Sequence, residues 1–268
     1  MKHWFGAACL LSALCGQAAA APAPLRVMSL NICTDQLLLA LAPQQRIASV
    51  TFMAREQGPL KLWPQAKRIP VNYGSAEEVL AAHPDLVLAA PFLPPLTRTL
   101  LARSGAKIVE VPLAENFAQI RGVTRLVAKA LGTQARGEAL IAQMDADLAE
   151  AASHRPAKPI RVAEWGNGGH VPGGAGLFGT LLQTAGAQSI VGGDGYDVEA
   201  LVAQRPQALL YSDAYRGLPS LRDDQDSHPA LTGRLPHIYY SSFYGCGVPQ
   251  LAHAALQLQR DLAQAVKP

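Results

Sequence analysis

The sequence predicts an α/β fold in which two similar lobes, with mainly parallel sheets, are joined by one long α-helix. The first observation is an internal repeat: EEVLAAHPDLVL at 77–88 returns 122 positions later as EALVAQRPQALL at 199–210. Each copy is typical of a short helix that stops before a proline and leads into a buried strand. The second observation is that strand and helix patterns alternate on both sides of the chain's middle, which favours parallel pairing through crossovers. The third is a proline-free, Ala- and Leu-rich stretch at 116–155 between the two halves.

In the first lobe, short apolar runs predict strands and the segments between them predict helices. The expected order is strand 26–30, helix 34–41, strand 46–50, the first repeat helix with its strand, a helix from Pro94 to about Gly105, and strand 107–111. Ser75 lies two residues before the repeated Glu77, where its hydroxyl can accept a hydrogen bond from a helix N–H. Asp197 has the same position before the second copy.

The central stretch predicts a single helix from about Thr133 to Ser153, because its apolar residues recur at helical spacing. These are Leu140, Ile141, Met144 and Leu148. Such a helix could be a peripheral core helix or a strut between the lobes, and its place at the midpoint of the chain favours the strut.

The second lobe restarts after Pro156 and Pro159. Its expected order is strand 160–165, a glycine-rich loop, helix 176–185, the second repeat helix with a strand ending at Ser212, strand 237–242, and a last helix from about Pro249 to Ala263. We therefore divide the chain into a leader at 1–20, a first lobe at 25–131, an interlobe helix at 132–155 and a second lobe at 156–268.

The N-terminus has the basic, apolar and small-residue succession of a secretory signal peptide, with cleavage expected after Ala20. This predicts a periplasmic protein. A lipid anchor at Cys15 is the less favoured alternative, because Leu14 is bulky where a small residue is expected. The formal net charge of +3 is small and its positive residues are scattered, so nothing indicates a nucleic-acid partner.

Several motifs in this order resemble a known family. They are RVMSL at 26–30, NICTD at 31–35, HPDLV at 83–87, the central helix and the second repeat copy. The chain resembles the substrate-binding proteins of ABC importers that capture vitamin B12, ferric siderophores or haem. The resemblance implies two Rossmann-like lobes joined by a rigid helix, a metal chelate held between them, and delivery of that chelate to a permease in the inner membrane. It implies a receptor and not an enzyme.

The resemblance also implies that one carboxylate on each lobe docks onto arginines of the permease. The matching residues are Glu77 and Glu199. An acidic residue in the first turn of a helix can alternatively serve only to complement the helix dipole. Glu78 is explained by a capping box with Ser75.

Ligands of open parallel sheets collect at the carboxyl ends of the strands. The ligand-binding residues expected there are Asn31, Cys33, Thr34, Phe52, Phe92, Trp165, His170, Tyr215, Phe243, Tyr244 and Cys246. Aromatic walls suit a large, partly apolar ligand such as a corrinoid, a porphyrin or another iron or copper chelate. The alternative is that about half of these rings fill the lobe cores.

Cys33 and Cys246, outside the leader, follow the first strand of one lobe and the last strand of the other, so both should face the cleft. They could form a disulfide, contact the ligand or a metal together with His170, or be unrelated thiols. His170 itself could be a ligand to a chelated metal or a solvated loop residue.

Other functions are less favoured. The GAGLFG segment at 174–179 matches a dinucleotide-binding pattern but comes late after its strand, so loop flexibility and helix entry explain it better. No resident cofactor is expected. A bare zinc or manganese cargo is disfavoured because the remaining histidines lie on scattered elements. The rival class is an exported enzyme acting through Cys33 or Asp213, although no hydrolase or metalloprotease motif supports it.

Overall fold

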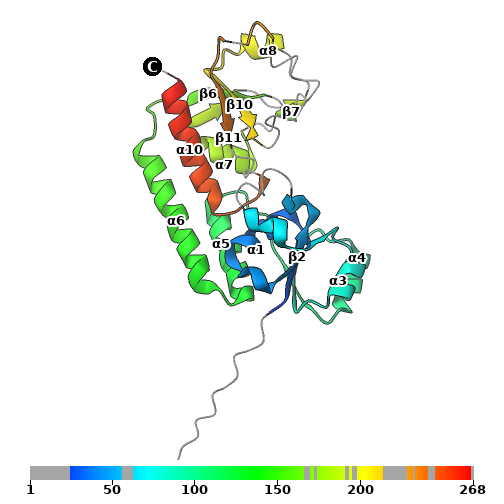
Figure 1. The fold of residues 1–268 in the computed structure, drawn as a ribbon. Helices are drawn as coiled ribbons and strands as arrows, with labels where there is room; N and C mark the ends of the chain where they lie inside the picture. The colour runs from blue at the N-terminus through cyan, green and yellow to red at the C-terminus, as the bar shows by residue number, and fades with distance from the viewer. Residues whose placement is uncertain are drawn as a thin grey trace, which may run out of the picture.

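The computed structural model places two parallel sheets side by side along one long helix, α6 (Figure 1). It describes residues 25–55, 63–165, 170–171, 174–190, 193–194, 198–213, 228–231, 233–240 and 245–266. The predicted signal peptide at 1–20 lies outside these residues. In the described part of the chain, no helix is both long enough and apolar enough to cross a membrane.

Lobe one is built on a five-stranded, all-parallel sheet with the order β3-β2-β1-β4-β5. Its elements are β1 (Val27–Ser29), α1 (Ile32–Leu41), β2 (Ile47–Thr51), β3 (Val71–Asn72), α3 (Ala76–Ala82), β4 (Leu86–Ala89), α4 (Pro95–Ala102), β5 (Lys107–Glu110) and α5 (Phe117–Leu131). Every strand that the sequence predicts in this lobe is present. The two-residue strand β3 is an addition.

Lobe two is built on a four-stranded, all-parallel sheet with the order β11-β10-β6-β8. Its elements are β6 (Ile160–Glu164), β7 (His170–Val171), α7 (Gly176–Thr184), β8 (Ala187–Ser189), β9 (Gly193–Asp194), α8 (Val198–Ala203), β10 (Ala208–Ser212), β11 (His237–Tyr240) and α10 (Gln250–Ala265). The short strands β7 and β9 pair with each other in antiparallel fashion.

The repeat is visible in the topology of the two sheets. The order β5-β4-β1-β2 in lobe one corresponds to β11-β10-β6-β8 in lobe two, and each repeat strand, β4 or β10, lies beside the first strand of its lobe. The residues before the two repeat prolines, His83 and Arg205, have φ of 44° and 51°. Among the described residues they are the only non-glycine residues in this left-handed region, so both copies leave the helix by the same backbone turn.

The same hydrogen bonds anchor each repeat strand. The backbone N–H of Arg26 donates to the Asp85 carboxylate at 2.6 Å, and that of Arg161 donates to the Gln207 side-chain oxygen at 2.9 Å. The guanidinium group of each arginine also donates to a carbonyl oxygen near the end of its repeat helix. The two lobes are therefore copies in local contacts as well as in strand order.

The strands alternate their side chains between two cores, as a period of two requires. On the α6 side one apolar cluster runs through both lobes, with strand residues Val27, Leu86 and Leu88 from lobe one and Val162, Ala208 and Leu210 from lobe two. On the other face each lobe has a small core of its own, containing Met28, Val79 and Val87 in lobe one and Ala163, Leu201 and Leu209 in lobe two. Each sheet is thus covered by helices on both faces.

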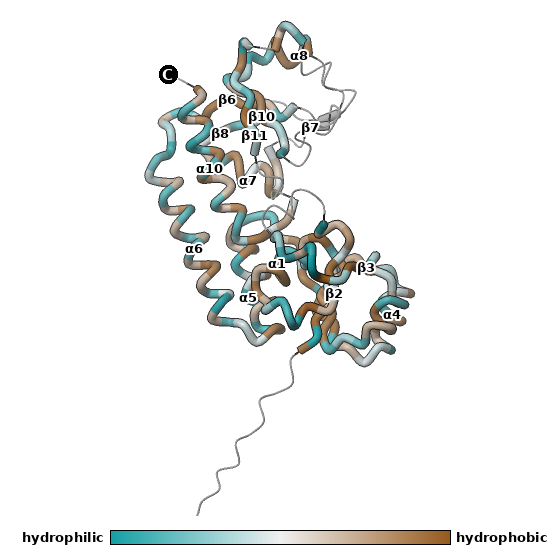
Figure 2. The backbone as a smooth tube through the Cα atoms, in the orientation of Figure 1, coloured by the Kyte–Doolittle hydropathy of each residue, from teal (hydrophilic) through white to brown (hydrophobic). Residues whose placement is uncertain are grey.

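Helix α6 (Gln134–Ser153) is the predicted interlobe helix. It packs against α5 of lobe one and α10 of lobe two (Figure 1), and both α6 and α10 alternate polar and apolar residues along their length (Figure 2). Arg121 on α5 donates to Asp145 on α6 at 3.0 Å, and Arg125 donates to Glu138 at 2.8 Å. These pairs fasten α6 to lobe one.

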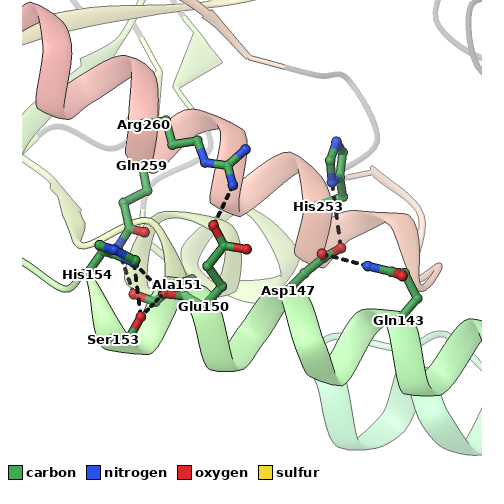
Figure 3. A network of polar contacts seen from close by, with 9 residues as sticks. All are labelled: Gln143, Asp147, Glu150, Ala151, Ser153, His154, His253, Gln259 and Arg260. Atoms are coloured by element: carbon green, nitrogen blue, oxygen red, sulfur yellow. Dashed lines mark hydrogen bonds and ion pairs between the residues drawn. The ribbon is translucent and has the colours of Figure 1, made fainter.

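A second set of polar contacts fastens α6 to lobe two (Figure 3). Arg260 on α10 forms an ion pair with Glu150, and Gln259 donates to a main-chain carbonyl of α6 at 2.9 Å. His253 lies 3.7 Å from the Asp147 carboxylate. Because α6 is held on both sides, it is a strut between the lobes and not a flexible crossover.

Candidate ligand-binding cleft

A cavity of about 320 Å³ lies between the lobes. Lobe one supplies the first turn of α1, the residues that follow β4 and β5, and Val123 of α5. Lobe two supplies the first turn of α7 and two glycines before α10, Gly245 and Gly247. The cavity therefore lies at the carboxyl ends of parallel strands, where ligands of such sheets bind.

Three predicted residues, Asn31, Cys33 and Thr34, line this cavity at the start of α1. Asn31 is the N-cap, and its side-chain oxygen accepts from the Cys33 backbone N–H at 2.9 Å. The Thr34 hydroxyl lies 2.8 Å from the Ser29 hydroxyl and 2.9 Å from the Asn31 carbonyl oxygen. These polar groups are fixed by local structure before any ligand arrives.

The rest of the lining is mainly apolar. Leu37, Val111, Leu177 and Phe178 contribute large side chains, and Glu115 is the one charged residue among the described residues that line the cavity. The N-cap of α7 is Ala175, and among the described residues no side chain caps this helix, so its first turn offers backbone N–H groups to an anionic part of a ligand. Phe178 is not among the residues predicted from the sequence, although it lies just after the glycine-rich entry into a predicted helix of lobe two.

Cys33 and Cys246 are joined in a disulfide, with their Cα atoms 5.1 Å apart. Of the three alternatives that the sequence leaves open, the structure therefore selects the disulfide. Cys33 no longer has a free thiol for catalysis or for metal binding. The bond crosses from lobe one to lobe two at the wall of the cavity.

The segment around Cys246 is pressed against lobe one. A Cβ added to Gly247 would lie 2.5 Å from the Ala114 Cβ and 2.7 Å from the Ala114 carbonyl oxygen, closer than atoms can approach. Beside this contact, the Thr180 hydroxyl of α7 donates to the Glu115 carbonyl oxygen at 3.0 Å. The two lobes are thus closed over the cavity at this edge.

Three exposed aromatic rings follow strands of lobe one, at the carboxyl ends of its sheet. Phe52 follows β2 and Tyr73 follows β3; their rings stack with centroids 5.2 Å apart and exposed fractions of 44% and 74%. Phe92, after β4, is 63% exposed. Phe52 and Phe92 are among the residues predicted from the sequence. Tyr73 is not, because the short strand β3 that places its ring beside Phe52 was not predicted.

Trp165 lies elsewhere. It is 5% exposed and packs with Ala163, Leu201 and Leu209 in the separate core of lobe two. Its backbone N–H continues the ladder to the Leu210 carbonyl, so its side chain falls on the same sheet face as that of Ala163. The expectation that it lines the cleft is not supported by this position.

Four other expected ligand-binding positions cannot be placed. Tyr215, Phe243 and Tyr244 lie outside the described residues, and so does the side chain of His170. The described residues contain no group of three or more His, Cys, Asp or Glu side chains that could hold a metal ion.

A buried carboxyl group lies beneath the first turn of α1. Asp35 is fully buried, and it accepts hydrogen bonds from the backbone N–H of Thr51 at 3.0 Å and from the Thr51 hydroxyl. Burial raises the pKa of Asp35 from 3.8 to about 6, against the opposing effect of hydrogen bonds from Ser29 and Thr51. This residue ties α1, which lines the cavity, to the end of β2, which carries Phe52.

The two expected docking carboxylates are both exposed, Glu77 in the first turn of α3 and Glu199 in the first turn of α8. The Ser75–Glu78 capping box forms as predicted, which leaves Glu77 free of that role. Asp197 lies outside the described residues. One of these helices belongs to each lobe, and both lie away from α6 (Figure 1).

Comparison with solved structures finds the same two-lobed fold. The apo form of the periplasmic haem-binding protein RhuT from Roseiflexus sp. RS-1 is 23% identical, with a TM-score of 0.70 over 91% of this chain and 99% of that one. A periplasmic haem-binding protein from Pseudomonas aeruginosa is 22% identical, with a TM-score of 0.70 over 91% and 95%. The molybdate-binding protein MolA of Haemophilus influenzae is 18% identical, with a TM-score of 0.73 over 89% and 86%.

A comparison with curated protein sequences gave no match. The sequence model of the periplasmic binding proteins, in contrast, matches residues 27–228, which is most of the chain. That family consists of binding proteins and not of enzymes, which argues against the exported-enzyme alternative. The chain belongs to the periplasmic binding protein family.

Proposed function

We propose that this protein is the periplasmic receptor of an ABC importer and that it carries a metal chelate between its two lobes. The observation that carries this proposal is the mainly apolar cavity at the facing carboxyl ends of the two sheets. A rigid strut on one side and contacts between the lobes on the other suit a receptor that encloses its cargo with little movement. A siderophore, a corrinoid and haem all belong to the proposed cargo class.

Haem is the cargo that the geometry favours within this class. The cavity of about 320 Å³ is near the small end of the range for ligand sites, so a macrocycle needs additional surface. The stacked rings of Phe52 and Tyr73 and the exposed ring of Phe92 all lie at the carboxyl ends of lobe-one strands, and we propose that they supply this surface. Of these three residues, only Tyr73 has an oxygen in its side chain, and a phenolate oxygen is a known ligand of haem iron. The haem-binding neighbours support the same choice.

The test is to identify what the protein binds. Protein purified from its native periplasm should carry a chelate that visible absorption and mass spectrometry identify, and ligand-free protein should bind haemin at one site. Phe52→Ala should weaken haemin binding roughly threefold to tenfold through lost ring contact. Tyr73→Phe retains the ring and tests the oxygen, because loss of iron ligation changes the absorption spectrum.

Failure of the native protein to carry a chelate, together with no binding of haemin, a ferric siderophore or cobalamin, would overturn the proposal. Binding of cobalamin or a siderophore in place of haemin would retain the receptor and reject haem. Turnover of a bound compound would instead support an exported enzyme.

The remaining parts of the proposal concern export, domain division and delivery. Residues 1–20 form a signal peptide that is removed on export. The mature chain divides into lobe one at 25–131, the interlobe helix at 132–155 and lobe two at 156–268. Glu77 and Glu199 present the loaded receptor to arginines of the permease, one from each lobe. Their exposure and their equivalent places in the repeat support this role.

A further inference from the structure

The Cys33–Cys246 disulfide joins the two lobes across 213 residues of sequence, at the wall of the cavity. Cys33 is in the first turn of α1, and Cys246 lies between two glycines that also line the cavity. Because each cysteine belongs to a different lobe, this bond limits how far the lobes can separate at the cavity.

The other contacts across this edge are not covalent. They include the close approach of Gly247 to Ala114 and the hydrogen bond from Thr180 to the Glu115 carbonyl oxygen. At the back of the molecule, α6 is fixed to both lobes by ion pairs. Breaking the disulfide would therefore leave the lobes joined at α6 and held at the cavity only by non-covalent contacts, which can open and close.

The location of Cys33 favours reduction of this bond. The side chain of Cys33 is partly exposed at the cavity, whereas Cys246 is buried. The N-terminus of α1 would stabilise negative charge on the Cys33 sulfur after reduction. A disulfide whose reduced form is stabilised in this way is more easily reduced than a purely structural one.

We propose that the Cys33–Cys246 disulfide is a redox-controlled latch on the cavity, opened by thiol–disulfide exchange with a dithiol reductant. This inference depends on the proposed function only in taking the cavity as the cargo site. In the oxidised protein the latch holds the lobes closed. In the reduced protein the lobes separate at the cavity and the cargo exchanges faster.

The exchange has two steps. A thiolate of the reductant attacks the Cys33 sulfur, which forms a mixed disulfide and releases Cys246 as a thiolate that takes up a proton. The second thiol of the reductant then attacks its own sulfur in the mixed disulfide and releases Cys33. Two electrons and two protons pass to the protein, and the reductant leaves as a disulfide.

The first experiment needs no cargo. Hydrogen exchange is measured on the full ligand-free protein, oxidised and reduced, and on the Cys33→Ser, Cys246→Ser double variant. We expect about tenfold faster exchange at the cavity amides 32–34 and 176–178 in the reduced protein and in the variant. These N–H groups belong to the first turns of α1 and α7 and have no carbonyl partner within their own helix, so their exchange follows the open fraction. The strands β4 and β10 serve as internal controls and should not change. The variant should not respond to reductant.

Two results of this experiment overturn the latch. One is equal exchange of the cavity segments in both redox states of the wild-type protein. The other is an increase that extends equally to β4 and β10, which would mean that the disulfide supports the whole fold. The wild-type comparison decides the question even when the double variant does not fold.

The second experiment measures the release of gallium(III) protoporphyrin IX. This haem analogue is chosen because its metal ion is not reduced by thiols. Dissociation should be about tenfold faster from the reduced protein than from the oxidised protein. Equal dissociation rates contradict the latch. Absence of binding in both states contradicts the proposed haem cargo instead, and hydrogen exchange then decides the latch alone.

Discussion

Asp35 shows how one buried residue connects local structure to the cleft. Its carboxyl group has no contact with solvent and accepts from Thr51, the last residue of β2. The residue after Thr51 is Phe52, and the residues before Asp35 line the cavity. A change at this position should therefore affect both stability and the shape of the cleft.

The raised pKa of Asp35 predicts a pH dependence of stability. The folded pKa of about 6 exceeds the ordinary value of 3.8. The contribution of the Asp35 carboxyl group to the free energy of unfolding is therefore fully present below pH 3.8 and is lost as the pH rises through 6. The difference between the two pKa values corresponds to about 3 kcal/mol. Between pH 3.5 and 7.5, ionisation of Asp35 should lower the free energy of unfolding of the wild-type protein by up to about 3 kcal/mol. The Asp35→Asn variant cannot ionise at this position and should not show that loss.

Urea denaturation at several pH values measures this difference. Asp261→Asn in α10, which changes a partly exposed carboxylate, is the control and should follow the wild-type profile. A profile of Asp35→Asn that is parallel to the wild-type profile would contradict the assignment.

At this scale the sequence predicted some positions in the cleft and not others. Asn31, Cys33 and Thr34 could be predicted because a residue that follows a first strand and starts a helix must lie at the carboxyl edge of the sheet. The same rule failed for Trp165, whose backbone still continues the strand ladder and whose side chain turns into the core. The disulfide was only one of three alternatives, because distance between lobes is not encoded in local sequence.

Among the elements, α5 and α6 show how closely two helices can pack. Gly137 of α6 is buried against α5, and a Cβ there would lie 2.6 Å from the Ala128 Cβ. Gly122 of α5 is exposed, and a Cβ there would have no neighbour within 4 Å. These two glycines therefore serve different purposes within one helix pair.

Substitution by alanine should change stability in opposite directions at these two positions. Gly137→Ala should destabilise the protein by about 1–3 kcal/mol, because the helices must separate to admit the methyl group. Gly122→Ala should stabilise it by about 0.5–1 kcal/mol, because alanine is the better helix former. Thermal and urea denaturation of both variants test this, and equal effects would show that the close approach at Gly137 is unimportant.

Long elements could be predicted and short ones could not. The apolar spacing at 133–153 was sufficient to predict α6 within one residue, and the repeat predicted α3, β4, α8 and β10 together. The strands β3 and β8 have two and three residues, too few for alternation to be detected. They form because β2 and β6 have backbone groups free to pair at the edge of each sheet, and this pairing depends on the tertiary structure and not on the local sequence.

For the whole molecule, the repeat places one exposed carboxylate on each lobe at equivalent positions. Neither Glu77 nor Glu199 is needed for the capping box or for the cavity lining. Two roles remain for them: complementing the dipole of their own helices, and the proposed contact with the permease. Because the two carboxylates are on separate lobes, a partner can bind both of them only when the lobes have the correct relative position.

Glu77→Ala combined with Glu199→Ala should leave ligand affinity unchanged and reduce uptake by cells that depend on this receptor. Affinity is measured on the purified variant, and uptake is measured with labelled ligand. Asp261→Asn, which changes a partly exposed carboxylate on α10 outside the ion pairs that hold α6, is the control variant. Normal uptake by the Glu77 and Glu199 variant would reject the docking role.

The apolar cluster that runs through both sheets has a consequence for how the molecule melts. Its residues come from both halves of the duplication, and α6 and α10 bury their apolar faces in it. Neither half can lose its packing without exposing the surface on which the other half rests. The two repeated halves therefore form one cooperative unit and should lose their structure together.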